Sequence, residues 1–407
     1  MNKEEAATSE AAVNELADNE KVMKKMRLRD MLSIPSLYIG PTISFKNVKW
    51  VYEGDVGMIQ REIMYTPGLW KIFDEILINA VKNKDRDPEM DTLKIDIDPI
   101  KNVITFYYNG KGIPIVKHEE QKTFIPSMIF DPLLPSFNCT DEEETVTGGL
   151  NCYGIKLANI FSTAFELETA STDLCLRFKQ TWTDNMTIAG IPVVEPYSGP
   201  NYTKITYSPD FDKFQMDLLN RDTIALLSRR VVEVAASTPG VNVYLNDKPL
   251  PINNFKEYVD LCLKGKVDRL GAQLKCVFEA VNERWEIAVV ASEHGFQQIS
   301  LANKFCTTKG GLHVEYITER VTRYLFENLK RRNKRDKTGI HVHPQTIRKH
   351  IMVFVNCSIV SPIFKDLSKE RLQGNFLYTS VEPSENFFTE LEACGITELA
   401  METTLEW

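Results

Sequence analysis

A glycine-rich segment that runs into an apolar stretch is the feature that most constrains how this chain folds. The segment reads Val-Thr-Gly-Gly-Leu-Asn-Cys-Tyr-Gly-Ile-Lys over residues 146–156, and the apolar stretch continues from Leu157 to Phe161. Backbone amides of such a turn form an anion site when the turn opens into a helix, because the positive end of the helix dipole faces it. Lys156 adds a point charge suited to a terminal phosphate. We therefore expect a helix over 157–161 behind a phosphate cradle, with a plain turn as the alternative.

A second segment, residues 68–83, predicts a helix with two stripes. Its apolar residues recur at helical spacing: Leu69, Ile72, Phe73, Ile76, Leu77 and Ala80. Glu75, Asn79 and Asn83 follow one another at i, i+4 spacing, so they stack on a neighbouring stripe. This pattern suits hydrolysis, because a glutamate can take a proton from water while an asparagine oxygen ligates a phosphate-bound magnesium ion. A solvated polar stripe on an amphipathic helix is the alternative.

A third segment, residues 103–114, is rich in β-formers and breaks at Asn109-Gly110. It predicts a strand followed by a turn.

In this order, the helix, the strand with its Asn-Gly-x-Gly turn and the glycine-rich loop resemble the ATP-binding fold of gyrases, ATP-dependent chaperones, mismatch-repair ATPases and histidine kinases. Longer strings resemble the N-terminal region of eukaryotic type II DNA topoisomerases, from about Lys24 to Trp407. These strings are Tyr38-Ile-Gly40, Trp50-Val-Tyr52, Pro67-Gly68, Lys71-Ile-Phe-Asp-Glu-Ile-Leu77, Asn109-Gly-Lys-Gly-Ile-Pro114, Asn159-Ile-Phe-Ser-Thr163 and Gly295-Phe-Gln-Gln-Ile-Ser300.

The resemblance implies an α+β chain built of two domains. Residues 24–251 form an ATPase domain with helices layered on a mixed sheet and an N-terminal strap that two subunits exchange. A hairpin over 241–250 closes this domain, and residues 252–407 form a second α+β layer, the transducer. Strands are expected at 285–291 and 351–357, where the sequence is β-rich. The acidic residues 1–23 are expected to be mobile.

The resemblance also assigns roles at an ATP and Mg²⁺ site. Glu75 is the general base, Asn79 the magnesium ligand with Asn83 nearby, and Lys156 and Lys369 contact phosphate. The remaining nucleotide-binding positions are Tyr108, Asn109, Ser136, Phe137, Asn138, Gly149, Leu150, Asn151, Cys152, Tyr153, Gly154, Ile155, Leu367 and Ser368.

Several positions depart from the family pattern. Tyr108 replaces an asparagine that reads adenine, and the loss of such a hydrogen bond typically weakens binding by about ten- to a hundred-fold. Cys152 stands where the family has a glycine against phosphate, and a Cβ at a left-handed position costs roughly 1–2 kcal/mol. Phe137 replaces a serine at the sugar, and Leu367 replaces the glutamine of a Gln-Thr-Lys loop. We therefore expect a weakened nucleotide site.

Charge is unevenly distributed. The net charge is −8, yet residues 330–335 read Lys-Arg-Arg-Asn-Lys-Arg. In the family, a basic cluster here lines the cavity entered by duplex DNA, so Lys330, Arg331 and Arg332 are expected to make non-specific, salt-sensitive backbone contacts. A solubilising helix end and a nuclear localisation signal are the alternatives. No apolar stretch approaches the roughly 20 residues of a membrane span, so we expect no membrane association. The resemblance implies a nuclear, chromosome-associated protein.

Two functional classes remain open. The first is an ATP-operated dimer gate acting in DNA topology and sister-chromatid segregation. The second is a non-catalytic pseudo-ATPase that partners intact topoisomerase II, as a heterodimer, or chromatin at centromeres. No strand cleavage is expected, because the sequence contains neither an acidic Glu-Gly-Asp-Ser segment nor a nucleophilic-tyrosine region. The chain is either an excised fragment or a naturally short relative of the topoisomerase.

Overall fold

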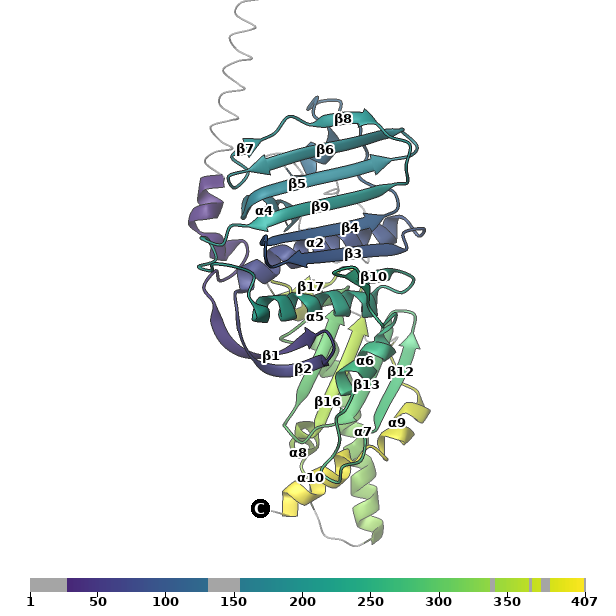
Figure 1. The fold of residues 1–407 in the computed structure, drawn as a ribbon. Helices are drawn as coiled ribbons and strands as arrows, with labels where there is room; N and C mark the ends of the chain where they lie inside the picture. Colours follow the sequence, from purple (N-terminus) through teal and green to yellow (C-terminus); the bar gives the residue numbers. More distant parts are fainter. Residues whose placement is uncertain (1–27, 131–153, 337–340, 366–367, 375–380, 406–407) are drawn as a thin grey trace, which may run out of the picture.

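The fold is described from a computed structural model, which defines residues 28–130, 154–336, 341–365, 368–374 and 381–405. A nine-stranded sheet occupies the upper part of the molecule in Figure 1 and a five-stranded sheet the lower part. Two short two-stranded sheets complete the strands of these described ranges. The predicted α+β class, with helices on mixed sheets, is confirmed.

The nine-stranded sheet is mixed. Its order is β11-β10-β3-β4-β9-β5-β6-β7, with β8 also paired to β6. Strand β10 pairs with β3 in parallel, and the other pairs are antiparallel. The strands are β3 (Thr92–Asp98), β4 (Val103–Asn109), β5 (Ser162–Ser171), β6 (Leu176–Thr183), β7 (Ile188–Ala189), β8 (Val193–Pro196), β9 (Tyr202–Pro209), β10 (Asn242–Leu245) and β11 (Lys248–Pro249).

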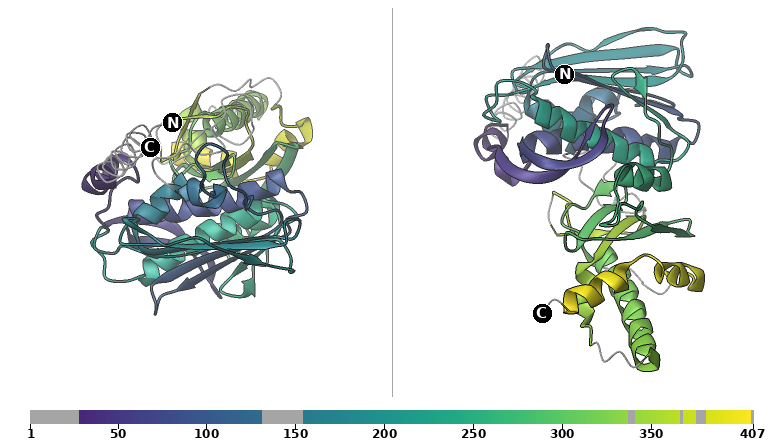
Figure 2. Two further views of the ribbon diagram at one scale, coloured as in Figure 1. Left: turned by 90° about the horizontal axis from the view of Figure 1, so that it is seen from above. Right: turned by 60° about the horizontal axis from the view of Figure 1, so that its bottom comes forward.

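Helices cover one face of this sheet. Burial alternates residue by residue along β3 and β4, so each strand turns one face to the core. Helices α2 (Pro67–Arg86) and α4 (Gly154–Ile160) pack against that face and against each other, behind the sheet in Figure 1 and to one side of it in the view from above (Figure 2). Helices α3 (Ile125–Phe130), α5 (Arg221–Ser237) and α6 (Phe255–Leu263) complete this part.

The N-terminal segment forms a separate ribbon. Residues 28–33 are helical, and the 3₁₀ turn η1 (Pro35–Leu37) follows. Strands β1 (Phe45–Glu53) and β2 (Gly57–Tyr65) then form a hairpin that packs on α5. The ribbon therefore lies beside the helices rather than in either large sheet (Figure 1).

The five-stranded sheet has the order β12-β13-β16-β14-β15. Its strands are β12 (Cys276–Asn282), β13 (Trp285–Ala291), β14 (Gln297–Ala302), β15 (Phe305–Cys306) and β16 (Ile351–Cys357). The long helix α7 (Leu312–Asp336) packs on β16 and extends downward in Figure 1. Around it lie α8 (Pro344–Lys349), α9 (Glu385–Leu391), α10 (Ile396–Leu405) and the small hairpin of β17 (Ile363–Phe364) and β18 (Leu372–Gly374).

Most predicted elements appear near their predicted positions. Strands β13 and β16 match residues 285–291 and 351–357, and β10 and β11 form the hairpin expected within 241–250. Helix α4 starts earlier than predicted, at Gly154, and ends at Ile160. Within the described ranges, no helix is both long enough and apolar enough to cross a membrane.

Candidate functional site

Helix α2 carries the predicted catalytic stripe. Pro67 lies in its first turn and Lys84 and Arg86 in its last, both favourable placements. The apolar stripe is fully buried. Glu75 and Asn83 are each only 7% exposed, and Asn79 is half-buried. The polar stripe is therefore not a solvated helix face, which removes the simpler interpretation of this pattern.

Glu75 lies between a lysine and a glycine. Its Oε1 pairs with the ammonium of Lys71, one turn earlier and also buried. Its Oε2 lies against Gly154, where an added Cβ would overlap the carboxylate. Burial alone would raise the pKa of Glu75, but the charges of Lys71 and Lys369 outweigh it and hold the pKa below its usual value. Glu75 is therefore ionised at neutral pH.

Lys369 reaches the same region from the other half of the molecule. Its backbone has φ +57°, and its side chain is largely buried. Burial lowers the pKa of Lys369 to about 8, although the nearby Glu75 carboxylate opposes this shift. Among the described residues, no carboxylate oxygen lies within 4.0 Å of its ammonium. Nζ instead lies 3.9 Å from the ring centroid of Phe305.

Helix α4 contributes two buried polar residues. Lys156 is fully buried, and Ile155 and Asn159 are also buried. The side-chain oxygen and nitrogen of Asn159 have no hydrogen-bond partner among the described residues. Because a buried amide without partners is costly, Asn159 is a polar position that the sequence analysis missed as a site candidate. Its position between apolar residues, three places after Lys156, is the signal that could have identified it.

Tyr108 fills space on the helix-covered face of the sheet. It shares the buried side of β4 with Ile104 and Phe106, and Phe106 packs against Phe73 of α2 with centroids 5.2 Å apart. Tyr108 is 3% exposed. Burial raises the pKa of its hydroxyl, and a hydrogen bond with Thr203 of β9 opposes this.

The turn after β4 is tied to neighbouring strands. Asn109 accepts hydrogen bonds from the backbone N–H groups of Asp91 (3.1 Å) and Thr92 (2.9 Å) and donates to the Asp91 carboxylate (2.8 Å). Its amide is therefore engaged at the start of β3. Gly110 has φ +90° and lies so close to Asp87 that an added Cβ would sit 2.5 Å from Oδ2. Asp87 also accepts from the N–H of Lys111 at 2.6 Å.

The remaining predicted positions divide into two groups. Ser368 is described, and its hydroxyl lies 3.5 Å from the Glu370 carboxylate. The other predicted positions lie outside the described residues: Ser136, Phe137, Asn138, Gly149, Leu150, Asn151, Cys152, Tyr153 and Leu367. The structure thus brings Glu75, Gly154 and Lys369 together from three distant segments.

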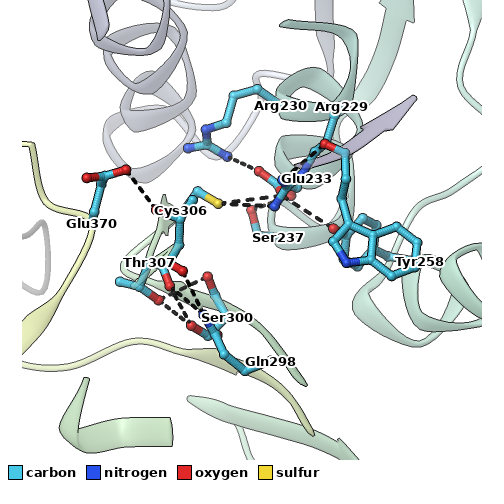
Figure 3. A network of polar contacts seen from close by, with 12 residues as sticks. Arg229, Arg230, Glu233, Ser237, Tyr258, Gln298, Ser300, Cys306, Thr307 and Glu370 are labelled. Atoms are coloured by element: carbon cyan, nitrogen blue, oxygen red, sulfur yellow. Dashed lines mark hydrogen bonds and ion pairs between the residues drawn. The ribbon is translucent and has the colours of Figure 1, made fainter. Parts of the chain in front are cut away.

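Arg229, Arg230 and Glu233 of α5 form a buried ionic cluster (Figure 3). Arg230 of α5 donates to Asp74 at 2.6 Å and to the carbonyl of Lys304 at 2.5 Å. Glu233 accepts from Arg229 at 2.7 Å and from the hydroxyl of Tyr258 at 3.3 Å. Asp74, which directly precedes Glu75, is thereby linked to the five-stranded sheet.

A cavity of about 670 Å³ lies beside the site. Tyr38, Trp70, Lys71, Arg229 and Glu370 are among its lining residues, but Glu75 and Gly154 are not. It therefore adjoins the Glu75 region without containing it.

The predicted DNA contacts are not equivalent. Lys330 and Arg331 are exposed near the end of α7. Arg332 is half-buried, and its guanidinium pairs with Glu398 of α10 at 3.2 Å. Of these three predicted DNA contacts, only Lys330 and Arg331 can reach a ligand at the surface without breaking an ion pair.

Comparison with known proteins shows which class of fold this chain has. The 43K ATPase domain of Thermus thermophilus gyrase B, solved in complex with an aminocoumarin, is 17% identical and superposes with a TM-score of 0.58 over 93% of this chain and 94% of that one. The fold is therefore that of the gyrase B-type ATPases. A family model described as DNA gyrase B matches residues 254–394.

Closer similarity is found to type II topoisomerases. The ATPase region of Saccharomyces cerevisiae topoisomerase II is 38% identical, with a TM-score of 0.84 over 92% of this chain and 96% of that one. The DNA topoisomerase 2-beta of Gallus gallus is 46% identical over 94% of this chain and 23% of its own length. This chain belongs to the type II DNA topoisomerase family and corresponds to its ATPase region. It spans about a quarter of the length of the curated relatives it matches.

Proposed function

We propose that this chain is the ATP-binding gate module of a topoisomerase II-like protein, with ATP and Mg²⁺ as its ligands. The observation that carries the proposal is that Gly154 lies against the Glu75 carboxylate while the charge of Lys369 acts on the same carboxylate. Lys369 provides an ammonium without a carboxylate partner within 4.0 Å among the described residues, as a phosphate site requires. Gly154 lets the Glu75 carboxylate lie against the helix start, where any side chain would displace it.

Each residue then has a defined task. Lys369 and Lys156 hold phosphate, and Asn79 supplies an oxygen to the metal. Magnesium-ATP supplies the phosphoanhydride that is cleaved. Glu75 orients a water and accepts its proton at Oε2, because Lys71 occupies Oε1. Tyr108 stands at the adenine position, so the base is held less tightly than in the family pattern.

The larger organisation follows from the same proposal. Residues 24–251 act as the ATPase domain with a strap exchanged between subunits, and residues 252–407 act as the transducer that carries Lys369 to the site. Nucleotide binding closes a homodimer, or a heterodimer with full-length topoisomerase II, around duplex DNA held through Lys330 and Arg331. The protein would work in the nucleus on chromosomes, where sister chromatids are segregated.

A second candidate is a pseudo-ATPase that binds a partner without turnover. Two observations favour it: the Tyr108 ring occupies the helix-covered face of β4, and the lowered pKa of Glu75 makes it a weak base. In that case the chain pairs with intact topoisomerase II or with chromatin at centromeres.

Glu75→Gln separates the two candidates. The variant keeps the shape of the side chain and its contact with Lys71 but cannot accept a proton. We expect wild type to hydrolyse ATP with Mg²⁺ and the variant to lose about 10²- to 10⁴-fold of that rate while still binding a non-hydrolysable analogue. Asn386→Asp, at an exposed position of α9, is the control for preparation quality. Equal rates in wild type and Glu75→Gln would contradict the gate and leave the pseudo-ATPase.

A further inference from the structure

The turn between β14 and β15 is a rigid feature of the five-stranded sheet. Ala302 pairs with Phe305, so Asn303 and Lys304 form a two-residue loop, with φ +50° and +68°. This is the geometry of a tight hairpin turn, in which asparagine is favoured at the first position. The side chain of Asn303 accepts from the N–H of Ile359 at 3.0 Å and donates to its carbonyl at 2.8 Å. The turn is therefore fixed by hydrogen bonds to the backbone of Ile359, in the same half of the molecule.

The tip of this turn is fastened to helix α2 at two points. The ammonium of Lys304 pairs with Asp85 at 2.6 Å, near the C-terminal end of the helix. The carbonyl of Lys304 accepts from Arg230, which also donates to Asp74. Asp74 is the residue before Glu75. The turn thus has a fixed position relative to the helix that carries the proposed general base.

Phe305 follows the tip directly and is 2% exposed. The Nζ of Lys369 lies 3.9 Å from its ring centroid, and that of Lys82 lies 5.7 Å away. The Phe364 ring packs edge-on against Phe305 with centroids 5.6 Å apart. An ammonium this close to a buried ring is attracted by the ring quadrupole, most strongly where water is excluded.

An aromatic ring and a carboxylate hold a lysine ammonium in different ways. A carboxylate would neutralise the ammonium and compete with a phosphate, whereas a ring face orients the ammonium and leaves its positive charge available. Lys369 has a long stem and a left-handed backbone, so something must fix where its ammonium lies. In the described part of the chain, Phe305 is the ring nearest to that ammonium.

We propose that Phe305 is a positioning residue, which holds the Lys369 ammonium beside Glu75 for the terminal phosphate of a nucleoside triphosphate. The inference rests on the proposed nucleotide-binding function and deepens it. Because the ring sits on a turn fastened to α2, it also couples the placement of Lys369 to the contact between the two halves of the molecule.

Phe305→Leu tests the inference, with Phe364→Leu as the matched control. Phe364 belongs to the same aromatic pair, but its centroid lies 6.0 Å from the Lys369 ammonium. The affinities for a non-hydrolysable ATP analogue and for ADP, each with Mg²⁺, are measured by calorimetry. We expect Phe305→Leu to weaken analogue binding by about ten-fold and ADP binding by less than about two-fold. Phe305→Tyr, which keeps the ring face, should restore the wild-type ratio.

The Lys369→Met background separates positioning from general damage. If Phe305 acts through Lys369, Phe305→Leu has no further effect on analogue affinity once the ammonium is absent. The inference would be overturned if Phe305→Leu weakened the binding of the analogue and of ADP equally. It would also be overturned if Phe305→Leu caused its full loss of analogue affinity in the Lys369→Met background.

A nucleotide-independent readout distinguishes failure of the inference from failure of the proposed function. In protein carrying ¹³C-labelled lysine, the ε-CH₂ signal assigned through Lys369→Met should be shifted upfield by the ring and return toward the random-coil position in Phe305→Leu. If wild type binds no nucleotide but this shift is present, the proposed function fails while the contact stands. If the shift is absent, the inference fails whatever the nucleotide result.

Discussion

At the scale of single residues, the side chains of the proposed site differ in how much space they occupy. Glu75 pairs its Oε1 with Lys71, and its Oε2 fits against Gly154 because that residue has no Cβ. Tyr108 does the opposite and fills the helix-covered face of β4 with a buried ring. A side chain added at Gly154 should therefore lower the stability of the fold, whereas a smaller side chain in place of Tyr108 should change nucleotide affinity.

Tyr108→Asn is expected to tighten binding of a non-hydrolysable ATP analogue by about ten-fold or more, because it restores an amide where the family reads adenine. The lost ring should lower the free energy of unfolding by about 2–4 kcal/mol, so thermal unfolding is recorded alongside the calorimetric titration. Tyr108→Phe removes only the hydroxyl that bonds Thr203 and should bind like wild type. An affinity of Tyr108→Asn at or below the wild-type value would show that the ring does not limit binding.

Gly154→Ala is expected to lower the free energy of unfolding by about 1–3 kcal/mol, because the new Cβ overlaps the buried Glu75 carboxylate. Urea denaturation measures the change. Gly374→Ala is the matched control, since its Cβ would meet only Ile363, at 3.9 Å. Similar losses in both variants would mean that Glu75 does not pack against Gly154 as described.

At the scale of elements, the start of α7 is joined to β14 and to the residues that follow β15 by a buried polar network. His313 is fully buried, and its Nε2 lies 2.9 Å from the hydroxyl of Thr307, which also bonds Ser300. Its Nδ1 has no partner among the described residues. Burial lowers the pKa of His313 to about 3, so the imidazole is neutral in the folded protein.

This network predicts a pH-dependent stability. Below about pH 6.5 the unfolded chain binds a proton at His313 that the folded chain does not, so the free energy of unfolding falls on acidification, by about 1.4 kcal/mol per pH unit, until about pH 3. Urea denaturation of wild type at pH 7 and pH 5 should differ by about 2 kcal/mol from this residue. His313→Gln should remove most of that difference, whereas His294→Gln, at an exposed position, should keep it. An unchanged difference in His313→Gln would contradict the account.

At the scale of the whole molecule, the C-terminal end of helix α7 extends beyond the five-stranded sheet (Figure 1), and its last turn is basic. Lys330→Gln combined with Arg331→Gln should weaken duplex DNA binding at every sequence and reduce the slope of log K against log salt by about 2. Arg332→Gln should leave that slope unchanged, because its guanidinium is paired with Glu398. Fluorescence anisotropy over a salt series measures both. A slope that falls only in Arg332→Gln would reverse this assignment.

The sequence predicted those features that depend on local pattern. The helical period of residues 68–83 gives α2, and continuous apolar runs give β13 and β16, because buried central strands need no polar alternation. The pairing of β10 with β3 in parallel could not be predicted, since register between distant segments depends on tertiary packing.

The site was only partly predictable for the same reason. Glu75 was found by its spacing to Asn79, but the contact of Lys369 with Phe305 joins residues that share no local pattern. Arg230 meets Asp74 across 156 positions of sequence. A signal was present in the sequence, because Arg229, Arg230 and Glu233 are charges flanked by apolar residues of α5, a pattern that indicates a buried ionic cluster.

The central claim is that this chain is a nucleotide-operated gate. Its most direct test is a calorimetric titration of the full chain with a non-hydrolysable ATP analogue and Mg²⁺, with light scattering on the same samples. Saturable binding together with a doubling of mass is the predicted result. Absence of binding at millimolar analogue would contradict the gate and leave a topoisomerase-related protein that acts through its surfaces alone.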